Sequence, residues 1–208
     1  QSIDIVRAAV RKGIKFIHFF TSGFGETGNL KLEKDLVREA QKGHLRIVGP
    51  NCIGVMRPEL SLNATFSRVN ADIGKLALVS QSGAMCSAVL DWAKSNRLGF
   101  SSVISLGSTA DVDFGEILDY LVYDNRTHSI LIYIEGTRNS RRFMSALRSA
   151  ARIKPILLLK AGRHAAGSAA VRAHSGLHAG ADSVFDAAVR RAGVVRVKNV
   201  GQLFYAAK

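Results

Sequence analysis

The chain has 208 residues and a net charge of +13, and 47% of its residues are hydrophobic and 22% charged. This composition is typical of a globular chain that builds one full core, or one domain and part of another, and it excludes general disorder. No apolar run approaches the ~20 residues that a bilayer-spanning helix requires, so we expect no membrane partner.

The positive charge and the cysteine content limit the class of partner and the compartment. Basic residues gather between Arg138 and Arg172, and a basic face attracts either nucleic acid or small ligands rich in phosphate. No zinc-finger spacing, RNA-binding signature or interleaved aromatic residues accompany them, which favours small ligands and leaves nucleic acid as an alternative. Cys52 and Cys86 are too few and too far apart for a disulfide framework or a metal site, and they fit a reducing cytoplasm.

Residues 1–58 predict about two α/β units. The expected elements are a helix over Ile3–Arg11, a strand over Lys15–Phe20, a helix over Leu30–Lys42 and a strand over Leu45–Val48. Two strands make a marginal sheet on their own, and no GxGxxG or P-loop is present, so we interpret this segment as the C-terminal part of a Rossmann-type domain. The chain starts at Gln1 rather than Met, and we expect it to be a piece of a longer protein. Residues 59–73 are predicted to be a linker.

Residues 74–208 show a regular alternation of short apolar strands and helices. Strands are expected at Lys75–Val79, Ser102–Leu106, Ser129–Glu135, Pro155–Lys160 and Val194–Val197. Helices are expected at Ala84–Ser95, from the capping residue Asp113 to Tyr123, at Ser140–Ile153 and Asp182–Arg191, and from Val200 onward, with a loop rich in Gly, Ala and Ser over 161–168. This rhythm is typical of βαβ units in a mostly parallel sheet covered on both faces. Five such strands predict a flavodoxin-like, doubly wound domain.

The turn Ser80-Gln81-Ser82-Gly83, between a predicted strand and a predicted helix, is the first candidate site. The first amides of a helix have no partner within it. Together with the helix dipole and the hydroxyls of Ser80 and Ser82, they would form an anion site at the carboxyl edge of the sheet. The same residues also fit an ordinary serine cap at a helix start.

His174 and Glu135 are the next candidates. His174 stands on a loop rich in Gly and Ala, whose small residues let a large partner approach, and an imidazole nitrogen can accept a phosphoryl group and pass it on. Glu135 ends a predicted strand at the same edge of the sheet, where it could accept a hydrogen bond from one ring nitrogen and leave the other nucleophilic. The alternatives are a surface histidine and an ordinary carboxylate at a strand end.

Two further loops follow the strands of the first segment, Thr21-Ser22-Gly23-Phe24 and Gly49-Pro50-Asn51-Cys52-Ile53-Gly54. Because both follow strands of one sheet, both should lie on one rim of that sheet. Cys52 has no base near it in sequence, so we interpret it as a small structural residue, with Asn51 and backbone groups facing a ligand.

The order and spacing of GPNCIG, VSQSGA, LIYIEG and AHSG, followed by FDAAVRRAGVVRV, resemble the succinyl-CoA synthetase superfamily. The set is most similar to the nucleoside-diphosphate-forming acetyl-CoA synthetases and to the ligase-like part of protein lysine acetyltransferases fused to a GNAT domain. The stretches LNATFS, LDWA and RRFMSALRSAARIKPILLLKAGR are most similar to the GNAT-fused group. The resemblance covers nearly the whole chain.

The resemblance implies a role for each candidate residue. His174 would be phosphorylated and Glu135 would orient its ring. The helix that binds the phosphate would start at Ser80, Ser82 and Gly83. A groove for coenzyme A or acyl-CoA would be lined by Phe20, Thr21, Ser22, Asn51 and Cys52. ATP or ADP, with magnesium, would bind to an ATP-grasp domain or subunit.

Three departures from the family pattern limit the activity and the substrate that we expect of this chain. The glycine-rich first half of the CoA-binding domain and the ATP-grasp domain are absent from this sequence, so we expect the fragment not to turn over by itself. Ser87 stands where members that use succinate carry a tyrosine, which argues against succinate as the substrate.

Besides a basic nucleic-acid-binding module, which rests on charge alone, two functions stay open. One is a fragment of a nucleoside-diphosphate-forming ligase that joins acetate or another acid to coenzyme A. The other is an acyl-CoA-sensing regulatory domain of a GNAT-type protein lysine acetyltransferase. The intact His174 favours the ligase. The incomplete first sheet predicts exposed edges that a missing half or another copy would cover, so we expect a homo-oligomer.

Overall fold

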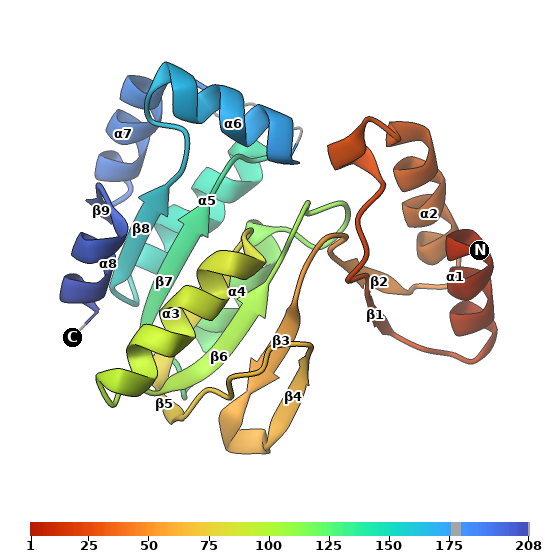
Figure 1. Ribbon diagram of the computed structural model, residues 1–208, viewed down its shortest axis with the longest axis horizontal. Coiled ribbons are helices and arrows are strands. Elements are labelled where there is room, and N and C mark those ends of the chain that lie inside the picture. Colours follow the sequence, from red (N-terminus) through yellow and green to blue (C-terminus); the bar gives the residue numbers. More distant parts are fainter. Residues whose placement is uncertain (176–179, 208) are drawn as a thin grey trace.

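Two β-sheets organise the chain (Figure 1). The computed structural model describes residues 1–175 and 180–207, which contain one parallel sheet of two strands and one sheet of seven strands. The smaller sheet and its helices lie to one side of the larger unit and hold the N-terminus, whereas the C-terminus lies on the opposite side. The α/β fold with a mostly parallel sheet is therefore confirmed.

The smaller unit follows the predicted order of elements. It consists of α1 (Ser2–Arg11), β1 (Phe16–His18), the 3-10 turn η1 (Gly25–Thr27), α2 (Leu30–Lys42) and β2 (Arg46–Val48). The two strands pair in parallel, and α1 and α2 pack against each other. Leu36 and Ala40 are one helical turn apart on α2, so both reach the same core, where they meet Val6 of α1 and Ile47 of β2.

The larger sheet has five parallel strands in the flavodoxin order. The strands are β5 (Ile73–Ser80), β6 (Phe100–Ser105), β7 (Ser129–Ile134), β8 (Ile156–Lys160) and β9 (Val195–Val197). They lie in the spatial order β6-β5-β7-β8-β9, which is the 2-1-3-4-5 order of flavodoxin-like folds when the strands are numbered along the chain. The predicted doubly wound sheet is confirmed.

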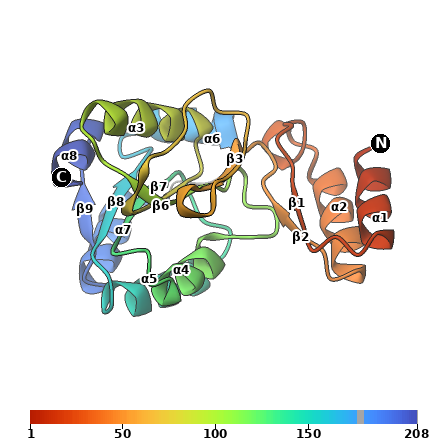
Figure 2. The ribbon, with the colours of Figure 1, turned by 90° about the horizontal axis from the view of Figure 1, so that it is seen from below.

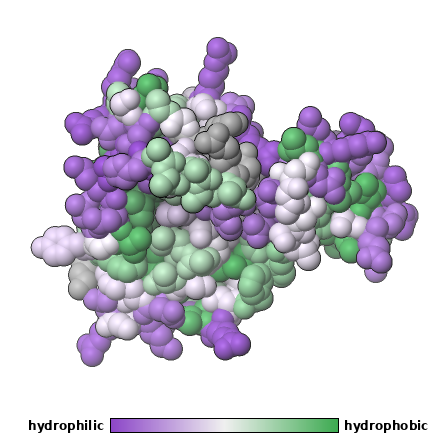
Figure 3. All heavy atoms as spheres, turned by 45° about the horizontal axis from the view of Figure 1, so that its top comes forward, coloured by the Kyte–Doolittle hydropathy of each residue, from purple (hydrophilic) through white to green (hydrophobic). Residues whose placement is uncertain are grey.

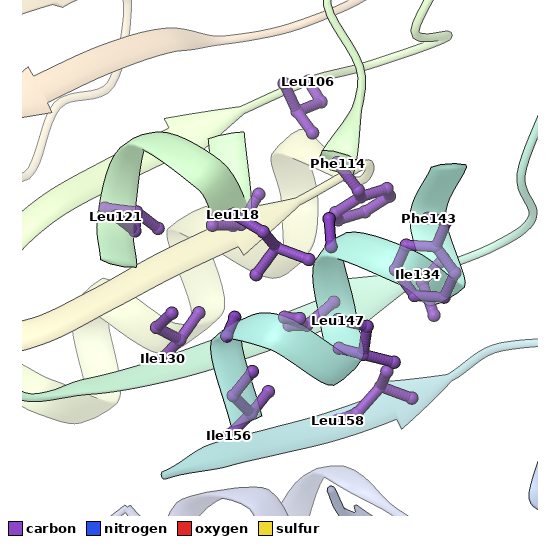
Figure 4. Close-up of a cluster of buried hydrophobic side chains, with 14 of the residues drawn as sticks. Leu106, Phe114, Leu118, Leu121, Ile130, Ile134, Phe143, Leu147, Ile156 and Leu158 are labelled. Carbon is purple, nitrogen blue, oxygen red and sulfur yellow. The ribbon is translucent and has the colours of Figure 1, made fainter. Parts of the chain in front are cut away.

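Helices cover both faces of this sheet (Figure 2). One face carries α3 (Gly83–Ser95) and α8 (Val200–Ala206), and the other carries α4 (Phe114–Tyr123), α5 (Ser140–Ala151) and α7 (Asp182–Arg191). Alternate residues of a strand point to opposite faces, so Ala77 and Val79 join the core under α4 and α5 while Leu78 joins the core under α3. Figure 4 shows the first of these cores, where Leu118 and Leu147 meet the side chains of the strands.

Local capping chemistry explains where two of these helices begin. Ser82 accepts a hydrogen bond from the amide of Met85 and starts α3. Asp113 starts α4, because its carboxylate accepts hydrogen bonds from the amides of Gly115 and Glu116. The cap predicted at Asp113 is confirmed.

A hairpin outside the predicted elements extends the larger sheet. It consists of β3 (Gly54–Arg57), the 3-10 turn η2 (Pro58–Leu60) and β4 (Leu62–Thr65), and β3 pairs antiparallel with β6. The segment expected to be a linker therefore contains a strand, although the division into domains stays a prediction. All of β4 except Thr65 is exposed, so no alternation of apolar and polar residues marks this strand in the sequence.

The expectation of a loop around His174 was wrong, because α6 spans Ala165–Ser175. The run is rich in alanine, the residue with the highest intrinsic helix propensity, and one internal glycine does not interrupt it. Figure 1 shows α6 lying across the edge of the larger sheet toward which β7 and β8 point. In the described ranges, no helix is long and apolar enough to cross a bilayer.

An ion-pair network joins the two units. Arg46 of β2 donates two hydrogen bonds to Asp111, at 2.9 and 3.2 Å, and a third to Glu116 of α4 at 2.8 Å. Asp111 also accepts a hydrogen bond from the backbone amide of Ile47 at 2.8 Å. The Asp111 side chain is only 7% exposed, so this carboxylate fixes the end of the smaller sheet to the larger unit.

We predict that Asp111→Ala lowers the free energy of unfolding by about 1–3 kcal/mol, because it leaves a buried amide and a half-buried guanidinium without their acceptor. Urea unfolding of the two chains measures this difference. Asp119→Ala, at an exposed position of α4, is the control and should change stability by less than about 0.5 kcal/mol. Equal effects of the two substitutions would contradict the proposed link.

Candidate functional site

The candidate site lies at the carboxyl ends of β5 and β7, where the order of the strands in the larger sheet changes direction. β5 has β6 on one side and β7 on the other, and the helices that follow β5 and β7 cover opposite faces. A crevice opens between the carboxyl ends of two such strands, which is where open α/β sheets bind ligands. The loops that start at Gln81 and Glu135 border this crevice.

Gln81 joins these two loops, and the sequence analysis missed it. Its side-chain oxygen accepts hydrogen bonds from the amides of Glu135 and Gly136, at 2.6 and 3.1 Å, and its side-chain nitrogen donates to the carbonyl of Gly136 at 3.0 Å. The residue is buried. An amide side chain can donate and accept at once. The side chain of Gln81 therefore makes hydrogen bonds to the backbone of Glu135 and Gly136 that a neighbouring strand would otherwise make. The only sequence signal is a glutamine between two serines after an apolar strand.

Ser80 and Ser82 have different roles in the turn. The Ser80 hydroxyl is fully buried, donates to the carbonyl of Ser82 at 2.8 Å and accepts from the amide of Ser82 at 3.0 Å. Ser80 therefore holds the turn, and its contribution to an anion site is indirect. Ser82 caps α3 and is partly exposed. In the part of the chain that the structure describes, the amides of Gly83 and Ala84 donate to no protein acceptor, so they are available to an anion.

Glu135 lies at the opposite side of the crevice. It is 5% exposed, and its backbone is held by Gln81. Burial, and secondarily the charge of Glu135, raise the pKa of Tyr133 above its ordinary value. Among the described residues, no hydrogen bond reaches the carboxylate of Glu135 from another side chain, so the carboxylate can accept one from a ligand or an incoming imidazole.

His174 is exposed and lies near the C-terminal end of α6. This helix contacts η1 of the smaller unit, so it spans from the larger sheet to the predicted ligand loops. Within the described ranges, no hydrogen bond joins His174 to Glu135, and the structure does not pair the two residues that the sequence analysis associated. Figure 3, turned so that the top of Figure 1 comes forward, shows hydrophilic residues mostly on the outside and more hydrophobic, white to green residues across the middle of this face.

The loops of the smaller unit meet the start of α3. The amide of Asn51 donates to the carbonyl of Thr21 at 3.0 Å, which brings the two predicted ligand loops together. A Cβ added to Gly83 would lie 2.5 Å from Cγ2 of Ile53, so only glycine lets the loop of Asn51 pack this closely against the start of α3. Thr21 and Ser22 remain exposed beside this contact.

Two aromatic rings border the same region. The rings of Phe20 and Phe66 are 5.5 Å apart in an edge-to-face arrangement, and they are 41% and 62% exposed. Phe66 follows β4 and lies within residues 59–73, which the sequence predicted to be a linker, so no site residue was expected there. Exposed aromatic faces of this kind suit an apolar or flat part of a ligand.

Neither cysteine is suited to act as a nucleophile. The Cys52 thiol donates to the carbonyl of Phe19 at 3.5 Å, and burial raises its pKa to about 11. Burial raises the pKa of Cys86 to about 12. A thiol reacts as the thiolate, so both groups are inert near neutral pH.

The fold defines a flavodoxin-like domain in which α3 begins, with its first amides free, at the point where the strand order of the sheet reverses. Residues 73–208 match the model of the succinyl-CoA ligase like flavodoxin domain. The chain belongs to this family.

Two proteins of similar sequence support the same assignment. The chain is 43% identical to acetate–CoA ligase (ADP-forming) I of Archaeoglobus fulgidus over 196 residues, which are 93% of the chain and 29% of that protein. It is 41% identical to the alpha subunit of acetate–CoA ligase (ADP-forming) I of Pyrococcus furiosus over 203 residues, which are 97% of the chain and 44% of that subunit.

A solved structure has nearly the same fold. It is dinucleotide forming acetyl-coenzyme A synthetase 1 of Ca. Korarchaeum cryptofilum in complex with phosphate and ADP, with a TM-score of 0.93 and 34% sequence identity. The match covers 98% of this chain and 44% of that one. The chain thus spans less than half the length of the relatives it matches.

We predict that Gln81→Leu lowers the free energy of unfolding by about 2–4 kcal/mol, because it leaves the buried amides of Glu135 and Gly136 without a hydrogen-bond acceptor. Urea unfolding measures the loss, and hydrogen exchange at the Gly136 amide should become faster. Gln41→Leu, at an exposed position of α2, is the matched control. A loss no larger than that of the control would show that Gln81 does not hold the two loops.

We predict that neither thiol reacts while the chain is folded. At pH 8, Ellman's reagent should label no cysteine of the folded chain and both after denaturation, because burial raises both pKa values. Unfolded thiols ionise near their ordinary pKa of 9.0, so stability should fall as pH rises from about 9 toward 11. Fast labelling of the folded chain at pH 8 would contradict the assignment of Cys52 as a structural residue.

Proposed function

We propose that this chain is the part of an ADP-forming acyl-CoA ligase that carries the phosphorylated residue, His174, and the site that binds its phosphoryl group. The observation that carries the proposal is the start of α3, where Ser82 caps the helix and, among the described residues, the amides of Gly83 and Ala84 donate to no acceptor. The high identity to two ADP-forming acetate–CoA ligases over almost the whole chain supports the reaction type.

The residues fit a transfer in two steps. A nitrogen of His174 attacks the phosphorus of an acyl phosphate, the bond from phosphorus to the acyl oxygen breaks, and the acid leaves as a carboxylate. The helix start and Ser82 stabilise the negative charge that the phosphoryl oxygens carry. Glu135 accepts the hydrogen bond of the other ring nitrogen and so stabilises the charged imidazole. His174 then gives the phosphoryl group to ADP.

The second ligand, coenzyme A or acyl-CoA, would lie along the loops of the smaller unit. We assign its groove to Phe20, Thr21, Ser22, Asn51 and Cys52. Thr21 and Ser22 are exposed and available as polar contacts. Cys52 is buried behind them and would act through the shape of its loop. The close packing of Ile53 on Gly83 supports a groove that would end beside the proposed phosphate site.

The acid is proposed to be small. Ser87 lies one turn into α3, where its hydroxyl donates to the carbonyl of Gly83 at 3.3 Å. This short side chain is turned back onto its own helix and offers no group for a second carboxylate, which favours acetate or another monocarboxylic acid over succinate.

We assign the nucleotide, with magnesium, to an ATP-grasp domain or subunit of the full-length protein. The unpaired edges of the two-stranded sheet would be covered by the other half of the CoA-binding domain or by a second copy. The alternative, an acyl-CoA-sensing part of a GNAT-type acetyltransferase, would bind acyl-CoA at the same groove without phosphorylation of His174.

The test is to incubate the full-length protein with labelled ATP, or with acetyl-CoA and labelled phosphate. We expect an acid-labile, base-stable label on the wild type, and a loss of at least about 100-fold in His174→Asn because the nucleophile is gone. His164→Asn, an exposed histidine just before α6, should label normally. Equal labelling of His174→Asn would refute the ligase proposal, and acyl-CoA binding without any label would favour the regulatory alternative.

A further inference from the structure

A cavity outside the candidate site lies between α5 and α7, at the carboxyl ends of β7 and β8. Its volume is about 410 Å³, within the range of pockets that hold small organic ligands. Its walls are mostly apolar. They include Phe143 and Met144 of α5, and Val184, Phe185 and Ala188 of α7.

A buried lysine, Lys160, also lines this cavity. It ends β8, and only 3% of it is exposed. An ammonium group has three donors. In the described part of the chain, its only hydrogen bond is a long one to the carbonyl of Ala161 at 3.4 Å. Asp182 is an ion-pair partner at 3.6 Å, and the ring of Phe185 lies 5.3 Å away.

The charges around Lys160 do not cancel. Asp182 is shared among Lys160, Arg196 and Arg163, and it is closest to Arg196. Arg196 also contacts Asp186 at 3.0 Å. Asp186 is shared in turn with Arg190 at 2.9 Å. The two carboxylates thus serve four cations, and Lys160 is the one of these cations that lines the apolar cavity and is almost fully buried. Burial lowers the pKa of Lys160, so an anion placed beside it would stabilise the charged form.

Hydroxyl groups complete the lining. Thr137 and Ser140 line the cavity and their hydroxyls are 2.8 Å apart. Gly136 lines it as well, and Gly136 is one of the groups that Gln81 holds. A ligand in this cavity would therefore contact the back of the loop that carries Glu135.

From this combination of apolar walls, one buried cation and two hydroxyls, we infer that the cavity is a binding site for a small organic anion with a hydrophobic body, such as an aryl or short-chain monocarboxylate. The carboxylate lies at Lys160 and the hydrocarbon part lies between α5 and α7. This site is separate from the crevice at Ser82 and does not rest on the proposed function.

The experiment is a titration of the intact protein, without coenzyme A or nucleotide, with phenylacetate and with its neutral analogue phenylacetamide. Isothermal calorimetry or ligand-observed NMR gives the two affinities. We expect phenylacetate to bind at least about tenfold more tightly, because a hydrogen bond to a charged group contributes about 1.5–3 kcal/mol. Lys160→Met should remove this preference.

Two variants of α7 test the position without depending on Lys160. Val184→Phe enlarges a residue that lines the cavity and is 70% exposed, so it should fold normally and weaken both ligands. Ala187→Phe, at an exposed position that does not line the cavity, is the matched control and should bind both as the wild type does. Melting temperatures confirm that each variant is folded.

Two results would overturn the inference. One is the absence of any difference between phenylacetate and phenylacetamide. The other is binding that survives Val184→Phe but is lost in Ser82→Ala, which would assign the acid to the candidate active site. Binding that survives in both His174→Asn and Ser82→Ala but is lost in Val184→Phe supports a separate site, whatever the outcome of the phosphorylation test.

Discussion

The geometry of the candidate site depends on the buried amide of Gln81 at the reversal point of the larger sheet. The helices after β5 and β7 leave to opposite faces, so the first residues beyond these strands lose their ladder partners. A buried amide or carbonyl without a partner is costly, and Gln81 supplies partners for both kinds of group at Glu135 and Gly136. The same side chain therefore holds the backbone of the loop after β7 to the turn that precedes α3.

A second constraint joins the two units of the chain. The loop after β6 lies so close to the loop after β2 that a Cβ on Gly107 would be 2.1 Å from the carbonyl oxygen of Pro50. Gly107 also has a positive φ of 54°, which favours glycine. Together with Ile53 packed on Gly83, this contact holds the loop after β2 against the larger unit, next to the start of α3.

The elements that follow strong local rules were predictable, and those that depend on distant partners were not. The apolar run before Ser80 and the cap at Asp113 appear in the structure as expected, because period and capping chemistry are local properties. The hairpin that contains β3 was missed, because its residues become a strand only by pairing with β6. The helix that carries His174 is the exception: its alanine-rich sequence favours a helix locally, yet a loop was expected there.

The sequence by itself determined the class of fold, the family and the identity of the polar residues at the carboxyl edge of the sheet. These depend on the alternation of strands and helices and on the order of short motifs along the chain. Only the tertiary structure decided how the candidates act together. It showed that Ser80 is used within its own turn, that Gln81 links the loops of Ser82 and Glu135, and that Lys160 ends at an apolar cavity. The reason is physical: hydrogen-bond partners and burial are set by contacts between segments far apart in the chain, and no local pattern of residues encodes them.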